Sequence, residues 1–253
     1  MQDLLALAVR LADEAAAAIR EIRAAGFAVA EKSDHSPVTL ADTRAEAIIT
    51  AGLRAATPDI PVIAEEEVAA GRITAPGNSF WLVDPLDGTR EFAAGRDEFA
   101  VCIGLIRDGA PVLGAVASPA LHELHAGLVG QGAWKTVHGA TVKIRARPPP
   151  PEGLTVMASR HYAADPALAD LLAGLKIASL TNIGSALKFL RLAEGEADFY
   201  PRLGRTFEWD TAAPQAVLEA AGGAVLTADD CPLRYGKPGF ENPNFNAYGL
   251  PEV

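Results

Sequence analysis

The chain opens with apolar positions that follow the period of an amphipathic helix. Over residues 2–24, apolar side chains recur every three or four positions, which places them on one face of a helix. These apolar positions are Leu4, Leu5, Ala8, Leu11, Ala12, Ala15, Ile19 and Ile22. A second helix is predicted over residues 41–56, ending before Thr57 and Pro58, because a proline disfavours helix in the residue that precedes it.

Short apolar runs follow these helices, and such runs between turn residues predict strands. The predicted strands are residues 60–64, 80–83, 99–107, 112–118, 123–128 and 132–136. Asp108-Gly109 and Gly130-Gln131-Gly132 supply the residue types that tight turns require. We therefore expect this part of the chain to form a sheet of consecutive, paired strands.

Four consecutive prolines, Pro148 to Pro151, interrupt the pattern, and proline fits neither a helix interior nor a central strand. We interpret this run as the boundary between an N-terminal α+β lobe, residues 1–147, and a C-terminal α/β lobe, residues 152–253; a stiff surface loop is the alternative. Beyond it strands and helices alternate. The predicted strands are residues 154–158, 177–180, 197–200 and 224–226, and the predicted helices are residues 165–175, 185–193 and 210–221. Such alternation predicts an α/β protein built in layers.

Composition narrows the class of protein. Hydrophobic residues make up 49% of the 253 positions, enough for a sizeable core, and the net charge of −10 argues against a nucleic-acid-binding protein. No apolar run approaches the ~18 residues that a membrane span needs. Charged residues interrupt the N-terminal apolar run, which does not read as a secretory signal. The two cysteines, Cys102 and Cys231, form no disulfide or zinc pattern, so we expect a cytoplasmic protein.

The most informative stretch for chemistry is Trp81-Leu82-Val83-Asp84-Pro85-Leu86-Asp87-Gly88-Thr89. It predicts a buried strand that runs into a turn and then a helix. Asp84 and Asp87 flank the turn with the Leu86 carbonyl between them, an oxygen-only set that suits Mg²⁺. Gly88 and Thr89 would place backbone N–H groups at a helix start, where phosphate binds well. The alternative is a turn in which the aspartates merely cap.

Three further acidic positions stand at the predicted ends of elements. Glu65 begins a run of three glutamates directly after a strand, where side chains project into α/β sites. Asp42 and Asp210 each stand near the start of a predicted helix. Each has an ordinary structural alternative, namely a solvated helix start for Glu65 and an N-cap for the two aspartates.

Cationic candidates occur in the second half of the chain. Gly184-Ser185 precede Lys188 at a predicted helix start, and Arg202 ends the strand-like Tyr200-Pro201-Arg202. The alternative for Lys188 is a solvent-facing helix residue. His122 and His125 are three apart in a strand-like context and should not converge on a zinc ion.

Taken together, these motifs resemble the inositol monophosphatase-like superfamily of Mg²⁺-dependent, lithium-sensitive phosphatases. Residues 81–89 match its pattern W-x-x-D-P-I/L/V-D-G-T, and Trp209-Asp210 followed by alanines match its second signature. Residues 84–92, 184–189, 200–202 and 208–213 are most similar to the bacterial 3′(2′),5′-bisphosphate nucleotidase branch of that superfamily. The resemblance covers nearly the whole chain and implies an α-β-α-β-α sandwich.

The resemblance also implies roles for individual residues. The implied metal ligands for two or three Mg²⁺ ions are Glu65, Asp84, the Leu86 carbonyl, Asp87 and Asp210. Asp42 and Thr89 resemble the pair that orients the attacking water. The implied substrate-binding residues are Gly88, Thr89, Gly184, Ser185, Lys188, Arg202 and Glu208. Arg205 stands where the branch usually has proline, Arg90 where it has lysine and Cys102 where it has asparagine, which leaves fine specificity open.

The implied reaction is Mg²⁺-dependent hydrolysis of a phosphate monoester in a small metabolite, with adenosine 3′,5′-bisphosphate converted to AMP and phosphate. An inositol-phosphate or sugar-bisphosphate phosphatase on the same fold is the nearest alternative. A haloacid-dehalogenase-type phosphatase needs aspartates two apart, whereas Asp84 and Asp87 are three apart. A non-enzymatic metal- or phosphate-sensing module would not need the whole acidic set. The resemblance leaves monomer and homodimer both open.

Overall fold

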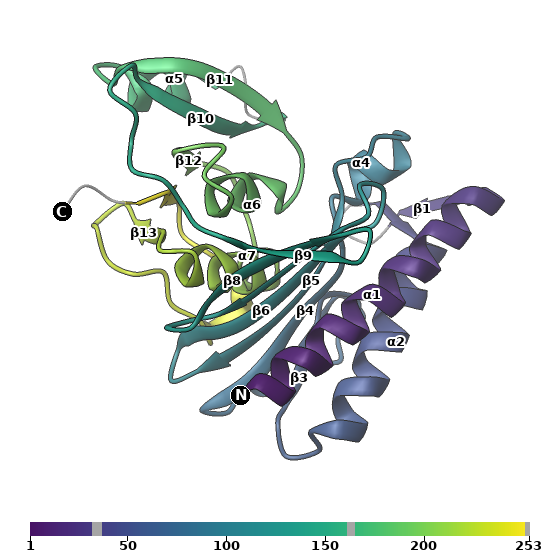
Figure 1. Ribbon diagram of the computed structural model, residues 1–253. Coiled ribbons are helices and arrows are strands. Elements are labelled where there is room, and N and C mark those ends of the chain that lie inside the picture. Colours follow the sequence, from purple (N-terminus) through teal and green to yellow (C-terminus); the bar gives the residue numbers. More distant parts are fainter. Residues whose placement is uncertain (32–36, 161–164, 251–253) are drawn as a thin grey trace.

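A seven-stranded sheet forms the centre of the first half of the chain (Figure 1). The computed structural model describes residues 1–31, 37–160 and 165–250. The spatial order of the strands follows the sequence, with the first pair parallel and each later pair antiparallel. The strands are β3 (Val62–Ala64), β4 (Ser79–Asp87), β5 (Ala100–Arg107), β6 (Ala110–Ser118), β7 (Glu123–Leu128), β8 (Gly132–Val137) and β9 (Ala140–Ile144).

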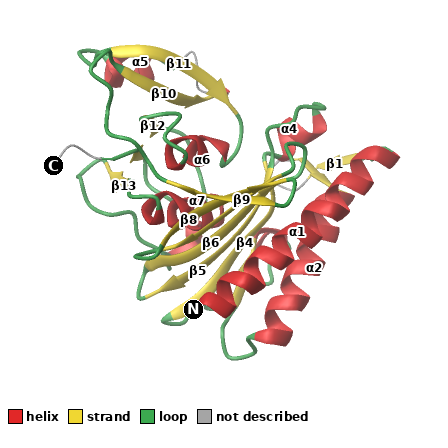
Figure 2. Cartoon of the chain, in the orientation of Figure 1, coloured by secondary structure: helices red, strands yellow, loops and turns green. Residues whose placement is uncertain are grey.

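Helices cover both faces of this sheet (Figure 2). On one face lie α1 (Gln2–Ala25) and α2 (Leu40–Ala56), which pack against each other and against the strands through the predicted apolar stripe. On the other face lies α7 (Glu208–Ala220), which contacts β4 to β8. The sheet is therefore buried on both sides, which explains why its central strands are apolar almost throughout.

Glycines in the sheet allow α7 to approach closely. A Cβ atom added at Gly114 would lie 2.2 Å from the carbonyl oxygen of Ala213, and one added at Gly127 would lie 2.5 Å from the Cα atom of Val217. Both glycines therefore face the backbone of α7, where a larger side chain would displace the helix. This contact determines where Asp210, in the first turn of α7, lies relative to the sheet.

A second, five-stranded sheet lies beyond α7 in the order β11-β10-β12-β14-β13. Its strands are β10 (Leu154–Ser159), β11 (Ile177–Ile183), β12 (Phe199–Arg202), β13 (Ala224–Thr227) and β14 (Phe245–Tyr248). The helix α6 (Leu187–Ala193) packs with α7 and β12. The helix α5 (Pro166–Leu172) packs through Leu168 and Leu172 against apolar residues of β10 and β12. The layers follow the order α-β-α-β-α, which confirms the predicted fold class.

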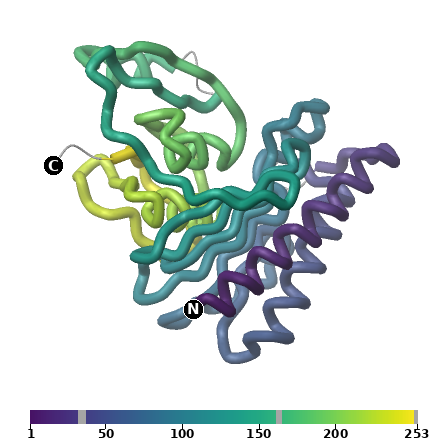
Figure 3. The backbone as a smooth tube through the Cα atoms, in the orientation of Figure 1, coloured from purple at the N-terminus to yellow at the C-terminus, as the bar shows by residue number. Residues whose placement is uncertain are grey.

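The proline run, residues 148–151, lies in the extended link that leads from β9 to β10 (Figure 3). It connects the two sheets, and one hydrophobic cluster contains residues from β5, α6, α7 and β14. Within the part of the chain that the structure describes, no helix is both long and apolar enough to cross a bilayer.

The predicted elements agree with the structure apart from their ends and a few short strands. The short hairpin of β1 (Val29–Glu31) and β2 (Pro37–Thr39), together with β9 and β14, was not predicted. These strands have three to five residues, too few to establish a period. The strands on either side of Asp108-Gly109 pair with each other as expected, and so do those on either side of Gly130-Gln131-Gly132. The backbone φ angles in the first turn are 51° at Asp108 and 72° at Gly109.

Candidate active site

A cavity of about 430 Å³ lies between the first sheet and the α6 and β12 region. It brings together residues from distant parts of the sequence, and many of them were predicted as site residues. The predicted residues that line it are Glu65, Asp87, Gly88, Thr89, Gly184, Ser185, Lys188, Arg202 and Asp210. Asp42, Asp84 and Leu86 are almost completely buried just behind this lining. A second hollow, of about 610 Å³ between α2 and α3 (Glu65–Ala69), contains none of the predicted set.

The motif that begins at Trp81 forms a bulge inside a strand. β4 continues to Asp87, and its register with β5 shifts between Asp84, opposite Cys102, and Asp87, opposite Ala100. The tight turn expected here is therefore a bulge, which re-aims the side chains of an otherwise regular strand. The Leu86 amide donates to Oδ1 of Asp84 at 2.9 Å. The bulge holds both carboxylates and the Leu86 carbonyl within one short stretch.

Gly88 ends the bulge and caps the short helix α4 (Thr89–Ala93) with φ 92°. A Cβ at this position would lie 2.9 Å from the carbonyl oxygen of Glu98. Both the left-handed backbone and the close approach require glycine. The glycine thus turns the chain so that Thr89 lies in the cavity wall.

Asp42 and Thr89 meet across the site. The Thr89 hydroxyl lies 3.0 Å from Oδ1 of Asp42 and 3.0 Å from the Leu86 carbonyl oxygen. The other oxygen of Asp42 accepts from the amide and the hydroxyl of Thr39, each at 2.7 Å. The N-cap of α2 is Thr39 and not Asp42, so the N-cap alternative for Asp42 is wrong. Asp42 is the N3 residue that closes the capping box with Thr39, and it is also the partner of Thr89.

Asp210 combines the same two functions in α7. Its Oδ2 accepts from the amide of Phe207, the N-cap, at 2.9 Å, so Asp210 is the N3 residue of α7 and not its N-cap, and it lines the cavity. Glu65 follows β3 as the first residue of α3 and reaches the cavity beside the parallel strand β4. Asp87 accepts a short hydrogen bond from the Ala186 amide, which ties β4 to the loop before α6.

The buried carboxylates repel one another. Burial, followed by the charges of Glu65 and Asp87, raises the pKa of Asp84 well above its usual value. Burial and Asp87 raise the pKa of Asp210 to about 8. Burial also raises the pKa of Asp87 to about 6, although Lys188 and Arg202 oppose this rise. Buried carboxylates in such a cluster are stabilised by a bound cation, and oxygen-only donors suit Mg²⁺.

One compact group of potential metal ligands lies elsewhere. Among the described residues, three side chains offer ligand atoms within 4.8 Å of one another, and these are Glu123, His125 and Glu194. Lys135 and Arg191 already pair with both carboxylates at 2.8–2.9 Å. Burial alone would raise the pKa of Glu194, but the hydrogen bond with His125, followed by Lys135 and Arg191, lowers it to about 2. The group therefore forms a neutralised ion-pair network that anchors α6 to β7 and β8.

Two cations, Lys188 and Arg202, line the same cavity as Asp87 and Asp210. Lys188 is 3% exposed, and its Nζ donates to the Ser185 carbonyl at 2.6 Å and lies 5.1 Å from the centre of the Tyr200 ring. Burial, and the charge of Arg202, lower the pKa of Lys188 to about 7. Arg202 donates to the carbonyls of Gly204 at 3.1 Å and Arg205 at 2.9 Å. Lys188 thus lines the cavity, and the alternative that it is a solvent-facing helix residue is wrong.

Glu208 differs from its expected position. Its side chain is fully buried, and its carboxylate accepts from the amides of Gly236 and Lys237, each at 2.8 Å. Lys237 Nζ lies 2.7 Å from it as well. Glu208 is not among the residues that line the cavity. These contacts tie the segment around residue 236 to the start of α7.

The sequence did not indicate the residues that hold the loop before α6, namely Arg160, Glu98 and Glu91. Arg160 lies 2.6 Å from Oε2 of Glu98, and the same carboxylate accepts from the Gly184 amide at 3.3 Å. Arg160 also pairs with Glu91 at 3.0 Å. Glu98 is 62 residues from Arg160 and 86 residues from Gly184 along the chain. The only signal in the sequence was that Arg160 follows the strand β10 and that Glu98 precedes the strand β5.

Known proteins share this fold and sequence. A model of the inositol monophosphatase family matches residues 1–250. The 3′(2′),5′-bisphosphate nucleotidase CysQ of Escherichia coli O6:H1 is 44% identical over 221 residues, which are 86% of this chain and 87% of that protein. The crystal structure of CysQ from Bacteroides thetaiotaomicron, a bacterial member of the same family, has a TM-score of 0.82 and 31% identity, covering 100% of this chain and 99% of that one. An inositol monophosphatase from Zymomonas mobilis has a TM-score of 0.80 and 28% identity, covering 98% and 93%.

The layered fold and the buried carboxylate site thus define the class, and the chain belongs to the inositol monophosphatase family. Within that family, relatives named CysQ are similar to this chain at 31–44% identity over most of its length. The family prediction made from the motifs is confirmed.

Proposed function

We propose that the protein is a Mg²⁺-dependent 3′(2′),5′-bisphosphate nucleotidase that converts adenosine 3′,5′-bisphosphate to AMP and phosphate. The observation that carries this proposal is the mixed charge of the cavity. Glu65, Asp87 and Asp210 line it together with the cations Lys188 and Arg202, whose charges oppose the rise in the pKa of Asp87. Such a cavity suits a small substrate with two phosphates, one bound through metal ions on the carboxylates and one bound by the cations. The names of the CysQ relatives at 44% identity support the same substrate.

The donor set fits Mg²⁺, since it consists of carboxylates and one backbone carbonyl. The residues that would hold two or three ions are Glu65, Asp84, Leu86, Asp87 and Asp210. Bound Mg²⁺ would supply an activated water and stabilise charge on the leaving oxygen. Binding would also relieve the repulsion that raises the pKa values of Asp84 and Asp210.

The chain's own residues would position the reacting groups. Thr89, held 3.0 Å from Asp42, would orient the attacking water, and Asp42 would accept its proton through the hydroxyl. The backbone N–H groups of Gly88 and Thr89 would donate to phosphate oxygens. Water attacks phosphorus, the bond from phosphorus to the 3′-oxygen breaks, and that oxygen takes a proton.

The two cations of the cavity would hold the second phosphate. Lys188 and Arg202 provide the charge, and charge-assisted hydrogen bonds to phosphate contribute about 1.5–3 kcal/mol each. Gly184 and Ser185 line the same cavity and would contribute backbone contacts. A cytoplasmic location is part of the proposal, since the described cysteines Cys102 and Cys231 are both free thiols.

A substrate panel tests this function. Purified protein with Mg²⁺ is assayed with adenosine 3′,5′-bisphosphate, inositol 1-phosphate, fructose 1,6-bisphosphate and 3′-AMP. We expect kcat/KM for adenosine 3′,5′-bisphosphate to exceed those for inositol 1-phosphate and 3′-AMP by at least ~10-fold, which corresponds to about 1.4 kcal/mol. A preference for inositol 1-phosphate would replace the proposal with an inositol monophosphatase, and a preference for fructose 1,6-bisphosphate with a sugar-bisphosphate phosphatase.

A further inference from the structure

Three side chains form a stack at the edge of the cavity. The rings of Phe207 and Trp209 lie 4.9 Å apart at an interplanar angle of 17°. The guanidinium of Arg205 lies over the Phe207 ring, with Cζ 4.6 Å from the ring centre. All three residues line the cavity. Because the Arg205 side chain is 61% exposed, the stack ends in a planar group that is open to an incoming ligand.

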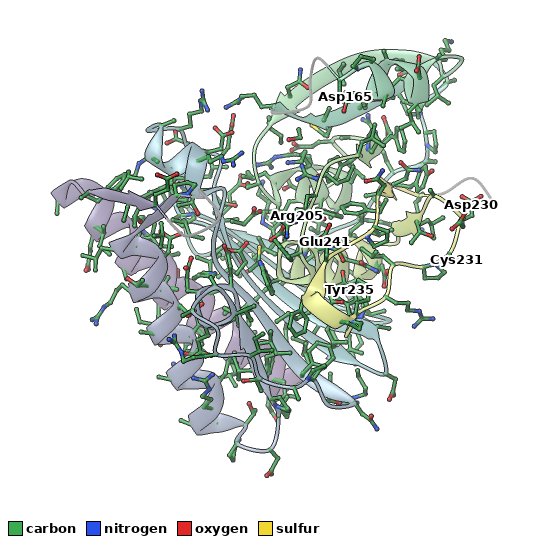
Figure 4. The ribbon with its side chains drawn as sticks, turned by 180° about the vertical axis from the view of Figure 1, so that it is seen from behind. Asp165, Arg205, Asp230, Cys231, Tyr235 and Glu241 are labelled. Atoms are coloured by element: carbon green, nitrogen blue, oxygen red, sulfur yellow. The ribbon has the colours of Figure 1, made fainter. Side chains whose placement is uncertain are left out.

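A carboxylate holds the edge of that planar group. Nε of Arg205 lies 3.2 Å from Oε2 of Glu241, and the two residues lie side by side in Figure 4. Glu241 is itself fixed, because its backbone pairs with Phe207 in an isolated antiparallel bridge. The neighbouring Asn242 donates to the Phe207 carbonyl at 2.8 Å. The Arg205 guanidinium, called the platform below, is therefore held on one face by the Phe207 ring and at its edge by Glu241.

The charge balance decides what kind of ligand this group suits. Glu241 neutralises the guanidinium and would repel a phosphate brought to the same edge. Stacking of a ring on the planar face of the guanidinium depends less on the net charge, because arginine also stacks on flat π systems. A flat, uncharged ring fits this position better than an anion does.

The Arg205 side chain also belongs to a loop that Arg202, proposed to bind the second phosphate, contacts directly. Arg202 donates to the backbone carbonyls of Gly204 and Arg205, at 3.1 Å and 2.9 Å. One short loop thus carries the Arg205 platform and is held by Arg202. A nucleotide is a ligand in which a phosphate and a flat ring lie a few bonds apart, so it could engage both at once.

We propose that the Arg205 guanidinium, supported by Phe207 and Trp209, is the platform on which the nucleobase of the substrate stacks. Arg205 is then a specificity-determining residue that separates nucleotides from phosphorylated polyols and sugars. This inference rests on the proposed nucleotidase function. It assigns the base to the side of the cavity that Arg205 and Glu241 form.

Two probes that differ only in the base provide the test. AMP and ribose 5-phosphate are titrated calorimetrically, with Mg²⁺ present, into the wild-type protein and the variants Arg205→Ala and Arg205→Lys. Both variants should raise the Kd for AMP by ~5- to 10-fold, since base stacking on such platforms has effects of this order. The Kd for ribose 5-phosphate should stay within ~2-fold of the wild-type value in both variants. The lysine variant is the matched control for charge, because it keeps the cation but loses the plane.

Kinetics and a second variant sharpen the test. Arg205→Ala should raise KM for adenosine 3′,5′-bisphosphate by ~5- to 10-fold with little change in kcat. Glu241→Gln, which removes the neutralising carboxylate and keeps the platform, should leave ribose 5-phosphate binding within ~2-fold. Thermal unfolding of each variant should match wild type, because these side chains are exposed.

Each outcome bears on the proposal. Equal weakening of AMP and ribose 5-phosphate by Arg205→Ala, tight AMP binding by Arg205→Lys, or clearly tighter ribose 5-phosphate binding by Glu241→Gln would mean that Arg205 binds an anion, and would overturn it. Unchanged AMP binding in Arg205→Ala would overturn it as well. Wild-type protein that fails to hydrolyse adenosine 3′,5′-bisphosphate would refute the nucleotidase function separately, because the binding ratio is measured without turnover.

Discussion

The hydroxyl of Thr89 lies 3.0 Å from Oδ1 of Asp42, although the two residues are 47 positions apart. The same hydroxyl lies 3.0 Å from the Leu86 carbonyl oxygen. A hydroxyl has a single proton, so only one of these two acceptors receives it fully at any time. Engagement of the Leu86 carbonyl by a cation would direct that proton to Asp42 and leave the oxygen of Thr89 as an acceptor toward the cavity.

This relationship predicts the effect of removing the base. Asp42→Asn should lower kcat by about 10²–10⁴-fold, the usual range for a general base. The measurement is kcat on adenosine 3′,5′-bisphosphate at saturating Mg²⁺. Thr89→Ser keeps the hydroxyl and should retain far more activity than Thr89→Val. Equal activity in the serine and valine variants would contradict a role for the hydroxyl.

The carboxylate cluster predicts how stability depends on pH and metal. In chelator, burial and Asp87 raise the folded pKa of Asp210 to about 8 from 3.8. A raised pKa means that the folded state favours the neutral acid. The contribution of Asp210 to the free energy of unfolding is therefore full below pH ~4 and is lost as the pH rises toward ~8. The melting temperature without metal should therefore fall over this range, and Mg²⁺ should restore it near neutral pH.

Asp210→Asn tests whether the charge of Asp210 causes this loss of stability, because the variant removes that charge. The variant should flatten the fall of the melting temperature with pH in chelator and should lose most of the stabilisation by Mg²⁺. Its activity should fall by several orders of magnitude, since the metal supplies much of the transition-state stabilisation. Full wild-type turnover in metal-free buffer would refute the metal-dependent mechanism.

Lithium sensitivity is expected from membership of the family. Li⁺ would compete for a Mg²⁺ position among Asp84, Asp87 and Asp210, so activity should fall as LiCl replaces NaCl at constant ionic strength. The measurement is the initial rate in fixed Mg²⁺ at tens of millimolar of each salt. Equal rates in the two salts would count against the proposed metal arrangement and leave the fold assignment intact.

Arg202 should determine the preference for a second phosphate. Arg202→Ala should remove most of the ~10-fold preference for adenosine 3′,5′-bisphosphate over 3′-AMP, because one charge-assisted bond is of that order. Hydrolysis of 3′-AMP should change little. Arg202→Lys retains the charge and should retain part of the preference. An equal loss on both substrates would indicate that Arg202 acts through the shape of the loop.

Glu208 should matter for stability more than for substrate. Its buried carboxylate accepts from the Gly236 and Lys237 amides, so Glu208→Gln should lower the free energy of unfolding by about 1–3 kcal/mol. KM should stay near the wild-type value. The exposed Glu14 provides a control, since Glu14→Gln should be nearly neutral. A large rise in KM without loss of stability would restore the sugar-contact role that the sequence resemblance implied for Glu208.

The local parts of the fold and site could be predicted from the sequence. The apolar periods of α1 and α2 and the Asp-Gly turn between β5 and β6 depend on residues within one or two turns of each other. Asp84 and Asp87 lie close together in almost any backbone conformation, because two residues separate them. Their spacing and residue types were therefore enough to indicate a cation and phosphate site.

Only the tertiary structure decided which distant groups meet. It placed the Ala186 amide on Asp87 and Glu241 beside Arg205. The contact of Asp42 with Thr89 was implied only by the family resemblance and not by local pattern. The tertiary structure also placed Glu208 on Gly236 and Lys237, away from the cavity lining. The physical reason is that these partners are chosen by how whole elements pack, such as α7 on the glycines of β6 and β7. Local residue patterns show which side of a helix is apolar, but they do not show which distant strand that side will meet.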